Sequence, residues 1–256
     1  MTGTATPLLE VQELTCRFGG LLALDRVSFA VQPGEIFGLI GPNGAGKTTL
    51  FNLISGLTPP TAGAVLWRGG AITNLPPHRR NRIGMARTFQ NLRLFDGLSV
   101  LENLLVALQR DGRNSVVAGL LGTAGHRRAE RQRLETAWQL LEELGLTHLA
   151  EREAGTLAYG DRRRLEMARA LATGPSLLLL DEPTIGLDVV SQRKVQDFLK
   201  FYQAEQKLTV LLTSHYMKDV EALCERAVII NQGLIQHDGP LSTIVGRFSQ
   251  TKIIEL

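Results

Sequence analysis

The sequence predicts an α/β fold in which helices cover a parallel or mixed β-sheet. Two observations support this prediction. An apolar run at residues 36–40 is followed by a glycine-rich loop and then by a helical pattern over residues 48–57. From Leu177 onward, strand-sized apolar runs at 177–180, 209–213 and 227–230 alternate with helical segments at 190–203 and 217–224. Such alternation is typical of a parallel sheet with helices on its faces.

The first forty residues have the spacing of β-strands. Apolar and polar residues alternate over residues 9–14 and 27–31, and residues 32–35 contain the Pro-Gly pair of a turn. An antiparallel β-subdomain is therefore expected at the N-terminus. A further short strand is expected at residues 64–67, before the turn at Gly69 and Gly70.

The loop after residues 36–40 fits G-x-x-x-x-G-K-[ST], the pattern of a phosphate-binding P-loop. Its glycines let the backbone approach a polyphosphate, and the N–H groups at the helix N-terminus point at the anion. Lys47 is expected to reach the β- and γ-phosphates, and the Thr48 hydroxyl to bind Mg²⁺. A glycine-rich turn with a chance lysine is the alternative, and the flanking strand and helix argue against it. The predicted nucleotide-binding residues are Gly41, Pro42, Asn43, Gly44, Ala45, Gly46, Lys47, Thr48 and Thr49.

Helical spacing appears in the middle of the chain. Apolar residues recur at positions 101, 104, 105 and 108, and again at 134, 138, 141 and 144. We therefore expect a helical subdomain at about residues 91–165, inserted into a single domain that spans residues 1–256. Residues 116–125, which contain glycines, are expected to form a mobile connection between helices.

Two carboxylates follow the apolar run at residues 177–180. Strand ends are where α/β sheets bind their ligands, so Asp181 is expected beside a metal ion. Glu182 is placed to accept a proton from an attacking water. An acid pair at a helix N-terminus is the alternative interpretation. Pro183 and the upstream P-loop favour the catalytic one.

Composition restricts the class of protein. The 256 residues carry 28 Lys and Arg against 25 Asp and Glu, and a net charge of +3 is too weak to indicate nucleic-acid binding. The basic clusters at residues 78–82 and 126–133 are interpreted as solvated faces. Cys16 and Cys224 lack metal-ligand spacing and fit a reducing, cytosolic compartment. Residues 1–9 do not resemble a signal peptide, and no apolar run is long enough to span a membrane.

Several further motifs occur in a characteristic order. Gln90 follows an apolar stretch, Leu-Ala-Tyr-Gly-Asp at 157–161 opens a helix, Leu187-Asp188 follows the acid pair, and a strand ends at His215. With the P-loop, this set resembles the nucleotide-binding subunit of ABC transporters over about residues 8–245. The resemblance implies an ATPase that uses ATP and Mg²⁺. It also implies a head-to-tail dimer that holds two ATP molecules between its subunits.

The resemblance implies a role for each motif. Phe18 would stack on adenine, although a plain core phenylalanine is the alternative. Gln90 would contact Mg²⁺ and the attacking water and signal to the membrane domain, and His215 would hold the γ-phosphate and the water. Asp188 would cross the dimer interface. The residues that would cap the γ-phosphate of the opposite subunit's ATP are Leu157, Ala158, Tyr159, Gly160 and Asp161.

The segment at residues 157–161 departs from the common Leu-Ser-Gly-Gly-Gln pattern. Ala158 removes a hydroxyl donor, and Ala158 with Tyr159 is similar to the branched-chain amino acid importer subgroup, which has Leu-Ala-Tyr-Gly-Gln. Asp161 replaces the last glutamine. Its carboxylate would repel a triphosphate unless it points away or pairs with one of residues 162–164. A low ATPase rate is therefore expected, with nucleotide binding retained.

The importer resemblance extends over about residues 8–180 and rests on residues 18–21, 51–56, 84–95 and 157–160, with the helical insert at about 110–135. It implies that residues 87–95 contact the permease. Residues 184–192 and 212–224 instead resemble the ATPase of ABC-2-type exporters, and Ser214 precedes His215 where the importers have glutamate. The chain therefore resembles a mosaic, natural or engineered, with a junction at about residues 175–183.

These observations favour the ATPase subunit of an ABC transporter that imports branched-chain or other hydrophobic amino acids. The alternatives are an ABC-2-type exporter ATPase, a soluble ABC ATPase acting on nucleic acid or ribosomes, and a non-enzymatic nucleotide-binding regulator. Glu182 and His215 argue against the regulator. The expected partners are integral-membrane permease subunits and a second ATP-binding subunit, identical or related, with no nucleic acid. The expected location is the cytoplasmic face of the inner membrane.

Overall fold

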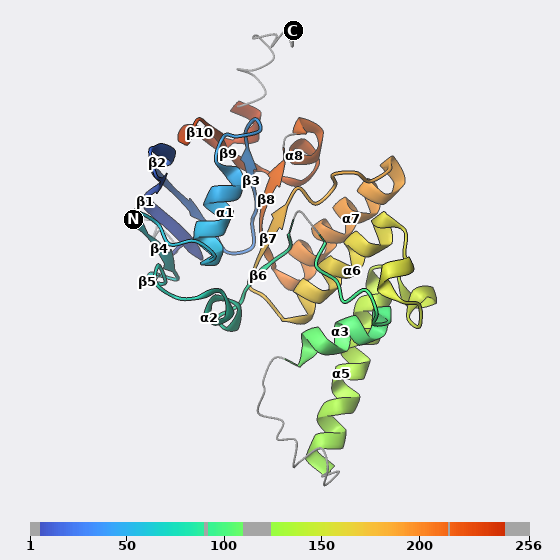
Figure 1. The fold of residues 1–256 in the computed structure, drawn as a ribbon. Helices are drawn as coiled ribbons and strands as arrows, with labels where there is room; N and C mark the ends of the chain where they lie inside the picture. The colour runs from blue at the N-terminus through green and yellow to red at the C-terminus, as the bar shows by residue number, and fades with distance from the viewer. Residues whose placement is uncertain (1–5, 90–91, 110–123, 215, 244–256) are drawn as a thin grey trace.

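The fold of the chain is given by a computed structural model, which describes residues 6–89, 92–109, 124–214 and 216–243. Its centre is a six-stranded mixed sheet of order β10–β9–β3–β8–β7–β6 (Figure 1). The strands from β9 to β6 run parallel, and β10 is antiparallel to β9. Their bounds are β3 Ile36–Ile40, β6 Met85–Arg87, β7 Leu177–Asp181, β8 Thr209–Ser214, β9 Arg226–Asn231 and β10 Leu234–Pro240.

Both faces of this sheet are buried, which explains the unbroken apolar runs in its strands. Side chains of a strand alternate between faces, so the four leucines of β7 divide into two pairs. Leu178 and Leu180 join a core formed with the helices that follow β6, whereas Leu177 and Leu179 join a core with α1 and the N-terminal strands. The predicted α/β class is confirmed.

A second sheet, of order β2–β1–β4–β5, is formed by antiparallel strands. Gly19, at φ +58°, allows the tight turn between β1 and β2. The N–H of Asp25 in β2 donates to the carbonyl of Gly233, between β9 and β10, at 3.0 Å. This contact holds the β1–β2 hairpin beside the turn between β9 and β10. The bounds are β1 Leu9–Phe18, β2 Leu21–Val31, β4 Ala62–Trp67 and β5 Gly70–Ala71.

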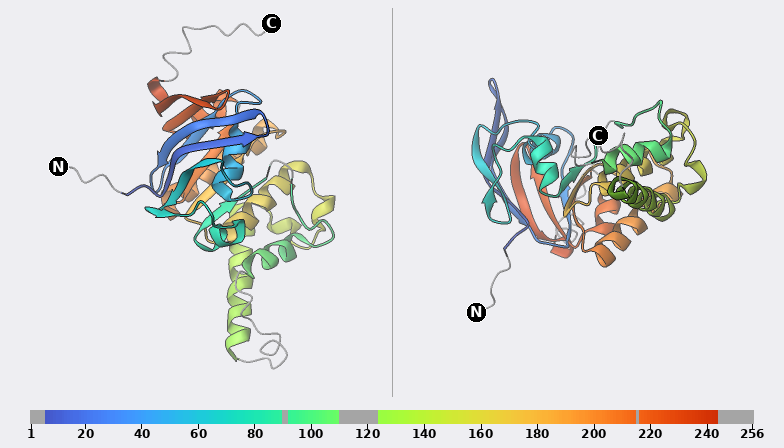
Figure 2. Two further views of the ribbon diagram at one scale, coloured as in Figure 1. Left: turned by 60° about the vertical axis from the view of Figure 1, so that its left-hand side comes forward. Right: turned by 90° about the horizontal axis from the view of Figure 1, so that it is seen from below.

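The helices lie on both sides of the six-stranded sheet, and α3, α5 and α6 pack together. A separate helical subdomain at about residues 91–165 stays a prediction. The longest of these three helices, α5, extends away from the body of the molecule (Figure 2). None of the helices in the described ranges is long and apolar enough to cross a membrane. The bounds are α1 Lys47–Ser55, α2 Pro77–Arg82, α3 Val100–Leu108, α5 Ala124–Glu143, α6 Tyr159–Ala172, α7 Val189–Gln206 and α8 Met217–Leu223, with 3₁₀ turns at Thr147–Leu149 and Ala154–Thr156.

Some elements were not predicted. Strand β6 has three residues, α2 has six residues rich in arginine, and most residues of β10 are partly or fully exposed, so none of them has a clear apolar period. The connection predicted at residues 116–125 lies outside the described residues, except that 124 and 125 begin α5.

Candidate nucleotide-binding site

The glycine-rich loop turns between β3 and α1 under tight steric limits. A Cβ atom on Gly41 would lie 2.2 Å from the carbonyl oxygen of Ile230, so only glycine fits there. Gly46 has φ +105° and caps the N-terminus of α1, and a Cβ atom on it would lie 2.9 Å from the carbonyl oxygen of Ala23. Neighbouring strands therefore confine this loop. The first N–H groups of α1 remain available to an anion.

Lys47 is buried at the first position of α1. Its ammonium donates to the carbonyl oxygens of Gly41 at 2.7 Å and Pro42 at 3.0 Å, so the side chain lies along the loop. Burial lowers the pKa of Lys47, and the nearby carboxylates of Glu182 and Asp181 oppose that shift. The cation is thus held beside the loop that is predicted to bind phosphate.

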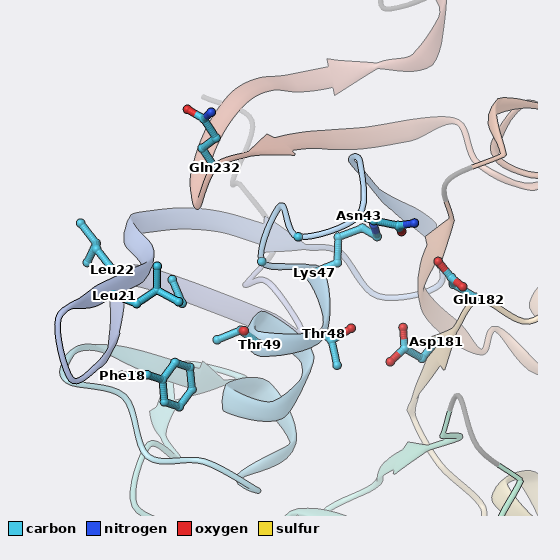
Figure 3. A pocket seen from close by; sticks show the side chains of 13 residues that line it. Phe18, Leu21, Leu22, Asn43, Lys47, Thr48, Thr49, Asp181, Glu182 and Gln232 are labelled. Atoms are coloured by element: carbon cyan, nitrogen blue, oxygen red, sulfur yellow. The ribbon is translucent and has the colours of Figure 1, made fainter. Parts of the chain in front are cut away.

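A pocket of about 560 Å³ opens over this loop. Asp181 and Glu182 line one end, beside Lys47 and Thr48, and Phe18 lies at the opposite end (Figure 3). The Phe18 residue is 51% exposed, which suits a base-stacking aromatic better than a core side chain. The lining residues are Phe18, Leu21, Leu22, Ala23, Asn43, Gly44, Gly46, Lys47, Thr48, Thr49, Asp181, Glu182 and Gln232.

Some predicted residues do not line the pocket, and some residues that line it were not predicted. Gly41, Pro42 and Ala45 shape the loop behind the pocket without lining it. The residues missed by sequence reasoning are Gln232 and residues 21–23. Gln232 belongs to the turn between β9 and β10, which the Gly233 N–H fastens to the carbonyl of Ala45 at 3.0 Å. No local sequence pattern indicates such a contact between distant segments.

Asp181 ends β7 with a buried and well-positioned carboxylate. Its Oδ1 accepts from the Thr213 hydroxyl at 2.8 Å, and its Oδ2 lies 3.5 Å from Nη2 of Arg87. Asp181 and the hydroxyl-bearing Thr48 line the same pocket, and these are the hard oxygen donors that Mg²⁺ prefers. The described residues contain no group of three or more His, Cys, Asp or Glu that could hold a metal. A cation at Asp181 and Thr48 would therefore share its coordination with phosphate oxygens.

Glu182 has an uncommon backbone conformation. Its φ of +49° lies in the left-handed region, which costs a non-glycine residue about 1–3 kcal/mol. Two hydrogen bonds hold it there. The Glu182 N–H donates to the Thr213 hydroxyl oxygen at 3.0 Å, and Nη2 of Arg163 donates to the Glu182 carbonyl at 3.0 Å. The carboxylate predicted to activate water is thus placed in the pocket by a strained turn fixed from both sides.

Arg163, on α6, is fully buried and joins three parts of the site. Besides Glu182, it donates to the carbonyl of Asp181 at 2.6 Å and to that of Phe89 at 2.7 Å. Its charge is balanced by Glu166, at 2.7 Å, which also accepts from the Phe89 N–H at 3.2 Å. Burial raises the pKa of Glu166 and Arg163 opposes the shift. Sequence reasoning considered residues 162–164 only as partners for Asp161 and missed this pair.

The segment at residues 157–161 forms the N-terminus of α6. Ala158 is the N-cap residue and makes no side-chain hydrogen bond to the helix. Asp161 forms an ion pair with Arg164, which also donates to the carbonyl of Leu144 at 2.6 Å. That pair removes the repulsion expected from an unpaired carboxylate. None of Leu157, Ala158, Tyr159, Gly160 and Asp161 is among the residues that line the pocket of the same chain.

The remaining predicted residues lie elsewhere. Asp188 is the N-cap of α7, where Oδ1 accepts from the N–H groups of Val190 and Ser191, each at 2.9 Å. The Ser191 hydroxyl also donates to Oδ2 at 2.7 Å, and these bonds, led by that of the hydroxyl, lower the pKa of Asp188. Gln90 and His215 lie outside the described residues, so their roles stay predictions. The role of Asp188 at a dimer interface also stays a prediction.

Comparison with known proteins identifies relatives along most of the chain. The family model described as "ABC transporter" matches residues 24–185. The high-affinity branched-chain amino acid transport ATP-binding protein BraF of Pseudomonas aeruginosa is 46% identical over 233 residues, which cover 91% of each chain. The lipopolysaccharide export system ATP-binding protein LptB of Escherichia coli is 38% identical over 234 residues, 91% of this chain and 90% of its own.

Solved structures of ATP-binding cassettes have a similar fold. The ADP conformation of an ATP-binding cassette of an ABC transporter superposes with a TM-score of 0.81 at 30% identity and covers 97% of both chains. A dimeric post-hydrolysis cassette bound to ADP and phosphate has a TM-score of 0.77 at 26% identity, over 91% of this chain and 98% of that one. Motifs, fold and relatives together place this chain in the ABC transporter family, as an ATP-binding cassette with ATPase activity.

Proposed function

We propose that the chain hydrolyses ATP in the pocket between the P-loop and the end of β7, and that a second copy or a related subunit completes that site. One observation supports this most. A buried lysine, an exposed aromatic side chain and two carboxylates at a strand end line a single pocket above a helix N-terminus. Lys47 and the N–H groups of α1 would bind the phosphates, and Phe18 would stack on the adenine.

Thr48 and Asp181 would hold Mg²⁺, which would neutralise phosphate charge when bound. Catalysis by this chain would then consist of positioning and proton transfer. Lys47 would exchange its bonds to the Gly41 and Pro42 carbonyls for phosphate oxygens. Glu182 would orient the attacking water and accept its proton, while Thr213 and Arg163 keep the Glu182 backbone in place.

The second subunit would supply the N-terminus of α6. Residues 157–161 open that helix, and Ala158 leaves its first N–H groups without a side-chain cap. Such a terminus favours an anion, and the γ-phosphate in a facing subunit is the proposed one. The dimeric cassette that resembles this chain supports this arrangement. The partner is a second copy or a related ATP-binding subunit.

For the transported solute, we propose branched-chain or other hydrophobic amino acids, taken up through permease subunits at the cytoplasmic face of the inner membrane. The relative named for branched-chain amino acid transport is 46% identical, against 38% for the relative named for lipopolysaccharide export. Export remains the second candidate because residues 184–192 and Ser214 depart from the importer pattern. Leucine uptake by vesicles that contain the chain and its co-purified permease would support import. ATP-dependent turnover without leucine uptake would contradict it.

Replacing Lys47 with alanine is expected to weaken ATP binding about 100-fold, because a charge-assisted bond to the phosphates is lost in a buried site. Fluorescence titration with a labelled ATP analogue measures the affinity. Lys218→Ala, at a lysine on α8 outside the pocket, is the matched control. Nucleotide affinity near that of the parent in the Lys47 variant would refute the proposed site.

A further inference from the structure

Arg87, at the end of β6, is a buried cation that none of the steps above uses. Its side chain is 8% exposed and lies against two aromatic rings. The centre of its guanidinium is 5.6 Å from the centroid of Phe51 on α1 and 5.2 Å from that of Phe89. A second cation, the guanidinium of Arg93, lies 4.4 Å from the centroid of Phe89. These cation–π contacts restrict the position of the Arg87 guanidinium.

The nitrogens of that guanidinium connect α1 with the end of β7. Nη1 donates to the amide oxygen of Asn52 at 2.8 Å and to the hydroxyl of Ser55 at 2.7 Å, both on α1. Nη2 lies 3.5 Å from Oδ2 of Asp181. The planar guanidinium contacts both elements with donors in a rigid arrangement, which the single ammonium of a lysine lacks. Arg87 therefore fixes the distance between the helix that begins at the P-loop and the carboxylate proposed to bind Mg²⁺.

The ion pair between Arg87 and Asp181 also changes the charge around a metal ion bound at Asp181. Both oxygens of Asp181 are engaged, one by the Thr213 hydroxyl and the other by Arg87. Thr213 is neutral, so Arg87 supplies a positive charge directly against the carboxylate. A cation at this distance in a buried site weakens the attraction of the carboxylate for a second cation while it holds the carboxylate in one orientation.

We propose that Arg87 is a positioning residue that sets both the orientation of Asp181 and the strength with which the site binds Mg²⁺. The proposal rests on the metal-binding role proposed for Asp181. Arg87 thereby lowers the affinity for Mg²⁺ and holds the Asp181 carboxylate in one orientation. Removing Arg87 therefore raises the affinity for Mg²⁺ and lowers turnover. A purely structural role would not change the two in opposite directions.

Two substitutions separate charge from geometry. Arg87→Gln removes the charge and keeps an amide that can bond to α1, and Arg87→Lys keeps the charge without the fork. In Arg87→Gln the Mg²⁺ concentration that half-saturates binding of a labelled ATP analogue falls about threefold, and turnover falls about tenfold. In Arg87→Lys the half-saturating concentration stays within about twofold of the parent, while turnover again falls.

Affinity for the analogue in EDTA stays within about twofold of the parent in both variants, because Arg87 does not line the nucleotide pocket. An unchanged Mg²⁺ dependence in Arg87→Gln, or equal shifts in the two variants, overturns the proposal. Asp181→Asn distinguishes a failure of the proposed metal site from a failure of the role proposed for Arg87. If that variant alters the Mg²⁺ dependence and the Arg87 variants do not, the inference about Arg87 fails. If Asp181→Asn also leaves it unchanged, the proposed metal site fails.

Discussion

Replacing Glu182 with glutamine is expected to lower ATPase turnover about 10²–10⁴-fold, the usual contribution of a general base. Glutamine has the same shape as glutamate but cannot accept the proton of the attacking water. The backbone bonds to Thr213 and Arg163 do not involve the side chain, so the strained turn at φ +49° should remain. Phosphate release at saturating ATP measures turnover, and titration with a labelled ATP analogue checks that binding is retained.

Glu221→Gln is the matched control, because Glu221 is exposed on α8 and does not line the pocket. Its turnover should equal that of the parent. Parent-like turnover in Glu182→Gln would instead remove Glu182 from the chemistry.

Replacing Arg163 with methionine is expected to lower the free energy of unfolding by about 3–5 kcal/mol, the usual cost of breaking a buried ion pair from one side. Glu166 would be left as a buried carboxylate without its cation. The carbonyls of Phe89, Asp181 and Glu182 would also lose a charged donor. Urea unfolding followed by circular dichroism measures the change.

A second substitution distinguishes charge from packing. Arg163→Met combined with Glu166→Met leaves no unpaired charge and should recover part of the lost stability, since a buried ion pair is often replaceable by apolar residues. ATPase turnover should not recover, because the backbone of Asp181 and Glu182 is still released. Full recovery of turnover in the double variant would show that Arg163 does not position the end of β7.

Local sequence patterns were sufficient for much of the architecture. Residues 36–40 form β3 as predicted, and the consecutive leucines at 177–180 form most of β7, because a strand buried on both faces leaves a continuous apolar run. The P-loop was equally predictable, since its chemistry depends on residues adjacent in sequence. The helix predicted at residues 190–203 extends from Val189 to Gln206, an ordinary error in a helix boundary.

Contacts between distant segments could not be predicted in this way. Arg163 is one of three consecutive arginines, and only the packing of α6 against β7 buries it and leaves its neighbours partly exposed. Arg87 is similar: its partners lie on α1 and β7, far away in sequence. Gln232 reaches the pocket only because a turn of one sheet lies beside a hairpin of the other.

The comparisons bear on how far the likeness to importer ATPases extends along the chain. The alignment with BraF covers 233 residues, which is longer than the stretch from 8 to 180, so the importer likeness continues into the last third. The exporter-like character of residues 184–192 and 212–224 is therefore a local feature within a chain that aligns with an importer protein along most of its length. The junction at about residues 175–183 stays a prediction.

The most direct test of the composite site is the mass of Glu182→Gln in solution with ATP and Mg²⁺, measured by light scattering. The account predicts a dimer of twice the 28.0 kDa chain mass, because ATP that is not hydrolysed keeps two copies closed. Adding Ala158→Glu, which places a carboxylate at the exposed N-cap of α6, should return the protein to a monomer without harming the helix. A monomer in the first sample, or a dimer in both, would contradict the claim that a second copy of this chain completes the site through its residues 157–161.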